Sequence, residues 1–536
     1  MRLDVKIMSV GSSSSAFLLP VTPLNDAHQT GFFIFRRGSL VAFAEIASLY
    51  ERDRHFPIRV LRQTILTAFR DGSFFDLLGV PFQQETTEDG SYVPLRKRKP
   101  TLHVSWVNEV IEDVGSMLFG EGHFPEIDSD AAAVADALVD LIEEADLRTV
   151  MSEAVLRASV GSAVLFCRFM GKPGHLRPVV SVSDSTWYVP VFDPADPSRL
   201  MSLTERYKVK GSALREMGYS ISPDDLSSDF WWKTAWDTVM ETGFVPAKVE
   251  ADENGTPNDA TVPDPKRTVQ HDLGFVPAIW IKLPGGDDPL DGRCLFAPAM
   301  DTVIEADYQL SQLGRGLKYS QDPLKVISMD GEVSSEFKKI VAGSDMLVLP
   351  EGGEAKLLET NGESARAVME FVGLLRRYAV RAISGSPIDP ERLTVPQSGR
   401  AMEILNMPLI QLADKMRSVF GSVLLRLFTM VREAAKKKPV VIKGKPFPKD
   451  GGDIRLRWPE WYPPTAMDRL QDVQAVAGAT QAKILSTESA LRFLSSRFDI
   501  DSVEDELKRL EKETNDDARR QQQQQQPGNG QQQQEA

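Results

Sequence analysis

Six histidines are the residues best suited to acid–base chemistry or metal binding, and their spacing argues against both. The chain has no HExxH pattern, and no two histidines lie four residues apart. Paired acids such as Glu143 and Glu144 fall at polar positions of an expected helix, where a solvated helix face is the simpler interpretation. We therefore expect no catalytic residue, no metal site and no cofactor. The histidines are His28, His55, His103, His123, His175 and His271.

Sequence patterns for nucleotide binding and nucleophilic catalysis are missing as well. Gly444 and Lys445 are followed by proline and lack the preceding glycine loop that cradles phosphates, so no ATP-driven motor is expected within this chain. The chain has no GxSxG pattern, and the serine run from Ser12 to Ser15 is interpreted as a flexible arm. An enzyme that uses scattered acids stays open as an alternative.

Charge limits how the protein can meet nucleic acid. The 536 residues carry a formal net charge of -14 with a pI near 5.1, which disfavours broad neutralisation of phosphates. Any contact with DNA must be local or weak. The basic cluster Arg96 to Lys99 is interpreted as a solvated loop, with phosphate contact as the alternative.

The same composition argues against export and membrane insertion. The two cysteines, Cys167 and Cys294, have no CxxC spacing, so neither a disulfide framework nor a thiolate metal site is expected. No apolar run approaches the roughly 18 residues of a membrane helix, and no secretory leader is expected.

The elements that would position any site change character along the chain. The first 296 residues mix short helices and strands, including an amphipathic helix from Asn108 to Gly122. Two helices then lead into a strand from Ser162 to Phe169, which is mostly apolar and therefore predicted to be buried. A β-rich stretch is expected from Ser181 to Val191, and a polar surface loop from Glu250 to Arg267.

Two long helices are predicted around a compact segment. The first begins at Ala297 and runs for about 23 residues, roughly 35 Å. Its apolar positions, Val303, Ile304, Tyr308, Leu310 and Leu313, are expected to pack on the second helix or on neighbouring copies. Strands and a short helix with glycine turns are expected from Leu324 to Thr360. The second helix is predicted from Glu363 to Ile383. Its apolar face comprises Val368, Phe371, Val372, Leu375, Tyr378, Ala379, Ala382 and Ile383.

A proline-rich stretch from Ser384 to Leu405 interrupts this helical pattern. The strongest helical periodicity follows it, and Pro408 predicts a kink within one long helix. The next segment is predicted to form a hairpin that turns at Asp450, Gly451 and Gly452.

The C-terminal region is predicted to be helical. Thr465 with Asp468, and Ser502 with Asp505, suggest capping boxes. In the last helix we expect i,i+4 pairs of Glu504 with Lys508 and of Asp505 with Arg509. Residues 519–536 are glutamine-rich and are predicted to form a disordered tail.

This order of elements resembles the portal proteins of tailed bacteriophages. The segments "NEVIEDVGSMLFGEG", "ASVGSAVLF" and "LGFVPAIWIKLPG", and "AISGSPI" before "SGRAMEILNMPL", look like portal segments in portal order, as does "STESALRFLSSRFDIDSVEDELKRLEKE". The resemblance implies an α+β, predominantly helical subunit with wing, stem helices, α/β clip and helical crown, assembling as a ring. The first 90 residues and the glutamine-rich tail carry no part of this resemblance. The implied parts are 1–296, N-terminal part of the wing; 297–323, first stem helix; 324–362, clip; 363–384, second stem helix; 385–397, tunnel loop; 398–462, long kinked helix and wing hairpin; 463–518, crown; 519–536, tail.

The resemblance places a tunnel loop in the channel through which DNA passes. Pro387, Pro390 and Pro396 prevent helical continuation there. Asp389 and Glu391 would repel phosphates and let DNA slide, an effect that Arg392 reduces. The residues expected to face DNA are Pro387, Ile388, Asp389, Pro390, Glu391, Arg392 and Leu393. A plain surface loop stays open as the alternative.

Other residues have roles that the resemblance implies less directly. Arg376, Arg377 and Arg381 are candidates for the channel wall or for pairing with a neighbour's acids. Phe337, Lys338 and Lys339 are candidate partner contacts of the clip.

The implied function is a non-enzymatic ring of about twelve copies at one capsid vertex, through which double-stranded DNA is packaged and ejected without sequence specificity. The implied partners are the terminase, which supplies ATP hydrolysis, the major capsid and scaffold proteins, and head-completion or tail adaptor proteins. The implied location is the virion, with assembly in the host cytoplasm and no membrane contact. Another virion or scaffold protein with long helical bundles and no DNA channel is the alternative.

Overall fold

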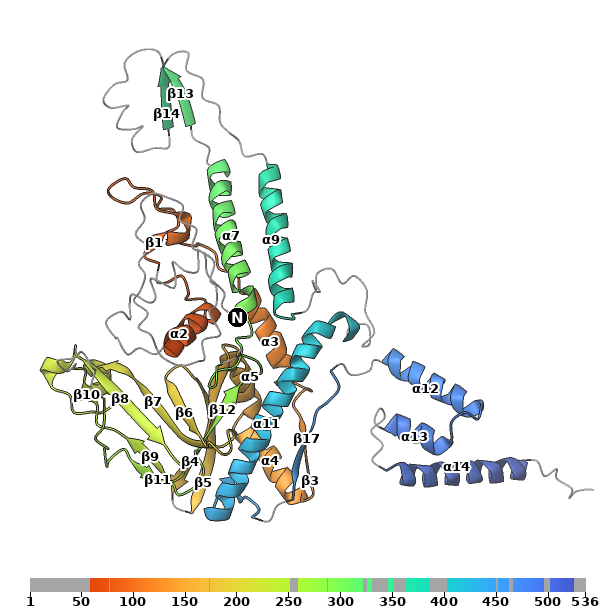
Figure 1. Cartoon of the computed structure of the whole chain (residues 1–536). Helices are drawn as coiled ribbons and strands as arrows, with labels where there is room; N and C mark the ends of the chain where they lie inside the picture. Colours follow the sequence, from red (N-terminus) through yellow and green to blue (C-terminus); the bar gives the residue numbers. More distant parts are fainter. Residues whose placement is uncertain are drawn as a thin grey trace, which may run out of the picture. The chain divides into compact units, whose positions relative to one another are not determined.

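The computed structural model contains both helices and strands (Figure 1). No helix in the described part of the chain is long and apolar enough to cross a membrane. The structure describes residues 58–76, 78–172, 174–250, 259–286, 288–321, 325–329, 346–350, 362–385, 403–449, 452–461, 466–495 and 502–524.

Strand β4, Ser162–Lys172, separates two hydrophobic cores. It pairs antiparallel with β5, His175–Asp184, on one side and with β12, Ala278–Lys282, on the other. Ala163, Leu165 and Cys167 enter the larger core, whereas Val164 and Phe166 enter a smaller one. The predicted burial of this strand is therefore confirmed on both faces, because alternate side chains point to opposite sides.

Helix α5 packs directly on β4 and β5 in the larger core, and α3 and α4 pack on α5. Helices α3, α4 and α5 span Trp106–Phe119, Ala132–Glu144 and Leu147–Ala158, where the periodicity predicts three helices. Val114, Leu118 and Leu138 are completely buried between them. Helix α2, Ile58–Arg70, packs into the same core through Ile65, Leu66 and Phe69.

A second, six-stranded sheet lies against the other face of β4. Its strand order is β11-β9-β8-β7-β6, and β10 also pairs with β8. Trp236, Tyr188 and Leu203 fill the small core between the two sheets. The strands are β6, Tyr188–Phe192; β7, Leu200–Lys210; β8, Asp229–Trp236; β9, Met240–Gly243; β10, Ala247–Lys248; and β11, Val269–Gln270.

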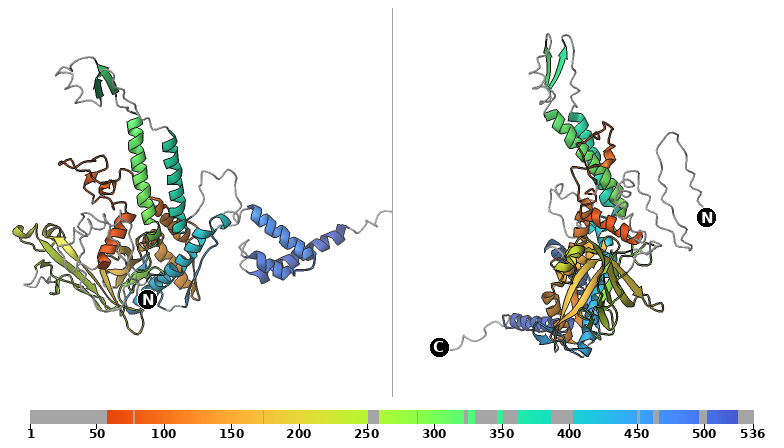
Figure 2. Two further views of the ribbon diagram at one scale, coloured as in Figure 1. Left: turned by 45° about the horizontal axis from the view of Figure 1, so that its top comes forward. Right: turned by 90° about the vertical axis from the view of Figure 1, so that its left-hand side faces the viewer.

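Two long helices pack side by side, as Figure 1 and the left view of Figure 2 show. A short 3-10 helix η3, Ala297–Ala299, leads into α7, Met300–Gln321. Its partner is α9, Gly362–Ala382. Between them, β13, Lys325–Met329, and β14, Met346–Pro350, form a parallel pair.

Helix α11, Met407–Lys437, begins later than expected. The sequence predicts a kink at Pro408, but the helical turn at residues 403–405 is interrupted at Asn406 and Pro408 lies in the first turn of α11. A proline is tolerated there because the first backbone N–H groups of a helix have no partner within it. The kink within one helix was therefore a wrong prediction.

The hairpin predicted to turn at residues 450–452 is also wrong. Strand β15, Val441–Ile442, turns at Lys443 and Gly444 into β16, Lys445–Pro446. Strand β17, Ile454–Arg457, pairs instead with β3, Glu126–Ser129, more than 300 residues earlier in the chain. A partner that distant gives no local turn signal.

Three C-terminal helices, α12, Ala466–Gln481, α13, Thr487–Ser495, and α14, Val503–Gln524, form a group (Figure 2). Ser502 caps α14, because its Oγ accepts a hydrogen bond from the Asp505 N–H at 3.3 Å. The ion pairs of α14 differ from the expectation and join Lys508 to Asp505 and Arg509 to Glu506, at i,i+3. Helix α14 also continues through Gln524, so the first six residues of the expected disordered tail are helical.

The remaining elements are short. They are β1, Val80–Pro81; η1, Leu95–Lys97; β2, Arg98–Lys99; α6, Gly211–Glu216; and η2, Pro223–Asp225.

A buried carboxylate, Asp291, fastens α2 to the sheets. Its oxygens accept hydrogen bonds from Arg59 at 2.8 and 2.9 Å, from Arg62 at 2.9 Å and from the Ser162 hydroxyl at 2.5 Å. The Arg59 guanidinium also donates to the carbonyl oxygens of Ser185 and Tyr188. Burial alone would raise the pKa of Asp291, but the hydrogen bonds and charge of Arg59, together with the hydrogen bond from Ser162, lower it.

Replacing Asp291 by asparagine should destabilise the fold by about 3–5 kcal/mol, because Arg59 and Arg62 lose a buried counter-charge. Since the pKa of Asp291 is lowered by folding, this stabilisation is present above the ordinary aspartate value of about 4 and is lost as the pH falls below it. Urea unfolding at pH 7 measures the effect. The matched control is Asp288→Asn, which changes a partly exposed carboxylate that bonds Arg62 at 3.2 Å. Equal midpoints for the two variants would contradict this role of Asp291.

Candidate functional site

The residues singled out from the sequence fall into two groups. The tunnel-loop residues Pro387 to Leu393 and the clip residues Phe337, Lys338 and Lys339 lie outside the described residues. Arg376, Arg377 and Arg381 are described, and all three are exposed on α9. The candidate site is therefore built on the helix pair α7–α9 and on the residues that position it.

Each helix of the pair buries one face. On α9, Val372, Leu375 and Ala379 are buried against the large core. On α7, the first three turns contribute Val303, Ala306 and Tyr308, while Leu317 near the other end is 43% exposed. The base of the pair is thus held in the core, and surface further along the helices stays open.

Asp307 fixes the base of α7 to the loop before α3. Its side chain is fully buried; Oδ2 lies 2.8 Å from the His103 Nδ1, and Oδ1 accepts the Val104 N–H at 2.8 Å. One turn later, the Ser311 hydroxyl oxygen accepts the backbone N–H groups of Thr101 and Leu102. The hydrogen bond and charge of Asp307 raise the pKa of His103, and burial raises the pKa of Asp307 itself.

The basic cluster Arg96 to Lys99 serves the same attachment. Arg98 is 1% exposed and donates to the carbonyl oxygens of Val93 and Phe82, which differs from the expected solvated loop. Arg96 pairs with Glu305 of α7 at 3.4 Å, and Lys99 pairs with Asp76 at 2.5 Å. Three of these four cations are therefore engaged within the chain, which leaves them poorly placed for phosphates.

The outer side of α9 carries the exposed charges. Arg376 donates to the Glu109 carboxylate of α3 at 3.3 Å, and this pair joins the two helices. Arg377 and Arg381 form no ion pair with any described residue. Between them lies Tyr378, whose side chain is 57% exposed. This side of the helix has no partner in the part of the chain that the structure describes.

The C-terminal end of α9 is closely packed, at the point where the segment 385–397 begins. Ser384 has a left-handed conformation with φ 58°, and the Gly385 N–H donates to the Val380 carbonyl at 2.8 Å. A Cβ at Gly385 would lie 2.6 Å from the Val110 Cγ2 of α3 and 2.7 Å from the Val380 Cγ1. Only glycine fits here, so α3 fixes the point from which the loop starts.

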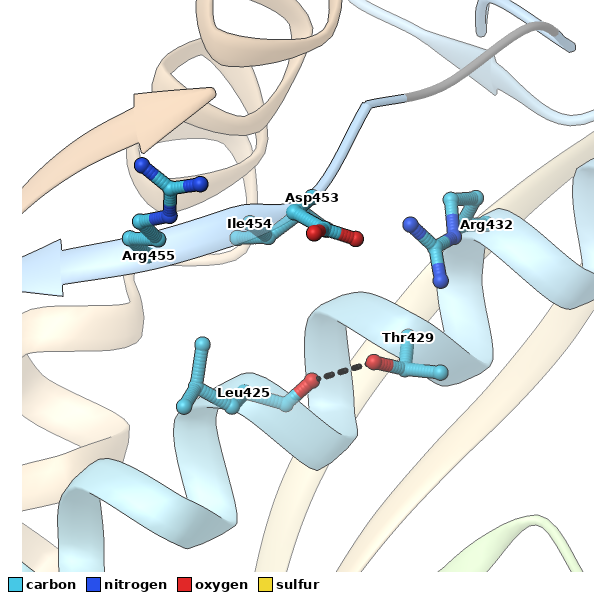
Figure 3. A pocket seen from close by; sticks show the side chains of 6 residues that line it. All are labelled: Leu425, Thr429, Arg432, Asp453, Ile454 and Arg455. Atoms are coloured by element: carbon cyan, nitrogen blue, oxygen red, sulfur yellow. Dashed lines mark hydrogen bonds between the residues drawn. The ribbon is translucent and has the colours of Figure 1, made fainter. Parts of the chain in front are cut away.

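One groove of about 360 Å³ lies between α11 and β17 (Figure 3). The Thr429 hydroxyl donates to the Leu425 carbonyl at 2.7 Å, and Arg432 donates to the Gly452 carbonyl at 3.0 Å. Asp453 and Arg455 complete its polar lining. This groove brings together no nucleophile with a base. Within the described ranges, no group of three or more His, Cys, Asp or Glu side chains is placed to hold a metal ion.

Sequence inspection missed the residues that set this geometry. Asp291, Asp307 and Gly385 stand alone in the sequence without a motif, and their importance comes from partners far along the chain. The available signal for Asp307 was a charged residue on the apolar face of the expected helix, three and four residues after Ile304 and Val303.

The base of this helix pair is packed in a hydrophobic core, and one side of it exposes arginines and aromatic rings. This combination is typical of structural proteins that assemble with further subunits. The comparison with protein families narrows this class: residues 359–520 match the model "Phage portal protein, SPP1 Gp6-like". The match extends from the start of α9 to the last helix and confirms the resemblance to phage portal proteins.

Solved structures with some likeness come from gene transfer agent particles. A chain of the "Virion of native gene transfer agent (GTA) particle" is 11% identical, with a TM-score of 0.36 over 73% of this chain and 88% of that chain. A chain of the "Neck of empty GTA particle computed with C6 symmetry" is 13% identical, with a TM-score of 0.35 over 73% and 90%. At these TM-scores the likeness supports no conclusion about this chain. The comparison with curated proteins gives no match.

Replacing Gly385 by alanine should lower the free energy of unfolding by about 1–3 kcal/mol, because the added methyl group is forced between Val110 and Val380. Chemical unfolding of the purified chain measures this. Gly373→Ala on the same helix is the matched control, since nothing lies within 4 Å of a Cβ there and alanine favours the helix by up to about 1 kcal/mol. If both variants were equally stable, α3 would not constrain the end of α9.

Proposed function

We propose that this chain is the subunit of a portal ring of about twelve copies, which forms the channel for double-stranded DNA at one capsid vertex. The observation that carries the proposal is the family match over residues 359–520. It covers α9, the proline-rich segment and α11, which the resemblance assigns to the second stem helix, the tunnel loop and the long wing helix. The packing of α7 and α9 supports the same assignment, because the pair is held at its base by Asp307 and Gly385.

The segment 385–397 is proposed to be the tunnel loop that faces DNA. Its three prolines exclude a continuous helix from α9 to α11. Asp389 and Glu391 against Arg392 give it a net negative charge, which a ring multiplies by the number of copies. Like charges repel the phosphates, so DNA would pass without being held.

The remaining parts are assigned by the same resemblance. The segment 324–362 with the β13–β14 pair would be the clip, and Phe337, Lys338 and Lys339 would contact the terminase and later the head-completion or tail adaptor proteins. Helices α12 to α14 would form the crown inside the capsid, near capsid and scaffold proteins. The chain would assemble in the host cytoplasm, reside in the virion and leave ATP hydrolysis to the terminase.

Deleting Asp389 to Val395 tests this function. The proposal predicts rings of normal size, because the segment is not needed to hold α9 and α11 in the core, together with a clear loss of packaged or retained DNA. Particles assembled with the variant would be assayed for nuclease-protected DNA, with the ring mass measured in parallel. Normal DNA content in deleted particles would contradict the tunnel-loop role, and loss of the ring would make the segment a structural part of the fold.

A further inference from the structure

One side of α9 combines positive charge with exposed apolar surface. Arg377 and Arg381 are exposed, and no described residue forms an ion pair with them. Tyr378 is 57% exposed, and Phe371, two turns away, is 42% exposed. Aromatic rings with this much exposure on a helix are typical of surfaces that another protein covers. DNA phosphates would suit the arginines but would leave the two rings in water.

Helix α3 carries the opposite charge on its exposed side. Glu109, Glu112 and Asp113 point to solvent there, and among the described residues only Glu109 has a cationic partner, Arg376. Burial, together with repulsion from Glu109 and Glu112, raises the pKa of Asp113. Negative charge on this face of α3 therefore exceeds what the cations among the described residues neutralise.

The two sets cannot meet within one chain. Side chains of a helix are spaced about 100° apart around its axis, so Arg377 lies about 100°, Arg381 about 140° and Tyr378 about 200° from Arg376. Arg376 is the residue that reaches α3. The free arginines and Tyr378 therefore lie on the far side of α9 from the acids. The cationic surface of α9 and the anionic surface of α3 are two different, complementary surfaces, as a head-to-tail ring requires.

We propose that Arg377, Tyr378 and Arg381 of one copy dock on the α3 face of the next copy, where Glu112 and Asp113 receive the two guanidinium groups. Phe371 extends the covered apolar surface along α9. This inference rests on the proposed ring and deepens it by naming a contact between subunits. It assigns Arg377 and Arg381 to that contact instead of to the channel wall. The arginines of α9 and the acids of α3 both lie near the base of the helix pair, where Glu109 contacts Arg376 and Val110 lies against Gly385.

Charge reversal in both directions tests the contact. R377E/R381E and E112R/D113R should each raise the subunit concentration at which half of the rings dissociate by about tenfold or more. The fourfold variant restores opposite charges and should return that concentration to near the wild-type value. Native mass measurements on the full chain across a dilution series give the readout. R215E, which reverses an exposed charge on α6, is the control and should assemble as wild type.

Other results would overturn the contact. Wild-type assembly by both double variants, or no recovery in the fourfold variant, would exclude this charge pairing. Rings of wild-type stability that retain less DNA when Arg377 and Arg381 are reversed would place the arginines against DNA instead.

A cross-linking experiment separates this inference from the ring itself. Chains carrying D113C alone and R381C alone are mixed and treated with a short bis-maleimide; the native Cys167 and Cys294 are buried. A linked pair of the two different variants can form only between copies. Absence of that pair in rings of normal size would overturn the contact while leaving the ring. Absence of any ring from the wild-type chain, even with capsid and scaffold proteins, would instead refute the proposed function.

Discussion

A pair of long helices cannot cover all of its own apolar surface, and this constraint governs the part of the chain around α7 and α9. Val372, Leu375 and Ala379 of α9 are buried, yet Phe371 and Tyr378 on the same helix stay exposed. Leu317 of α7 is exposed as well. The hydrophobic effect stabilises such a pair only when further protein covers the remaining surface. Assembly with other copies would supply that cover, as the match to phage portal proteins suggests.

The rest of the described chain holds the base of this pair in a fixed position. Asp307 and Ser311 attach α7 to the segment before α3, and Gly385 lets α9 end against Val110 of α3. Asp291 in turn fastens α2 to the sheets below. These contacts are hydrogen bonds between buried polar groups, or close approaches of atoms, inside an apolar core. The loss of a partner or the addition of a methyl group costs far more free energy there than on the surface. A rigid base fixes the point at Gly385 from which the chain leaves α9.

Local periodicity predicted much of this fold. The apolar spacing in α3, α4, α5, α7 and α9 belongs to each helix by itself, and the apolar run from Ala163 to Cys167 in β4 indicated burial on both faces. Features set by distant partners could not be predicted in this way. Strand β17 pairs with β3 instead of its sequence neighbour, and Arg98 is buried by carbonyl groups that no charge pattern reveals. Pro408 was misjudged because a proline in the first turn and one within a helix look alike in sequence. For the candidate site, the sequence singled out the arginines of α9 as candidates, whereas Asp307 and Gly385 gave no motif.

The central claim is that copies of this chain form a ring around a channel. Electron microscopy of the purified full chain, combined with its native mass, tests this most directly. The account predicts closed rings of about twelve copies with a central hole, and with the α7–α9 pairs arranged around that hole. Monomers that assemble only when capsid and scaffold proteins are added would give the same ring. Closed bundles without a hole, obtained with and without those proteins, would contradict the account.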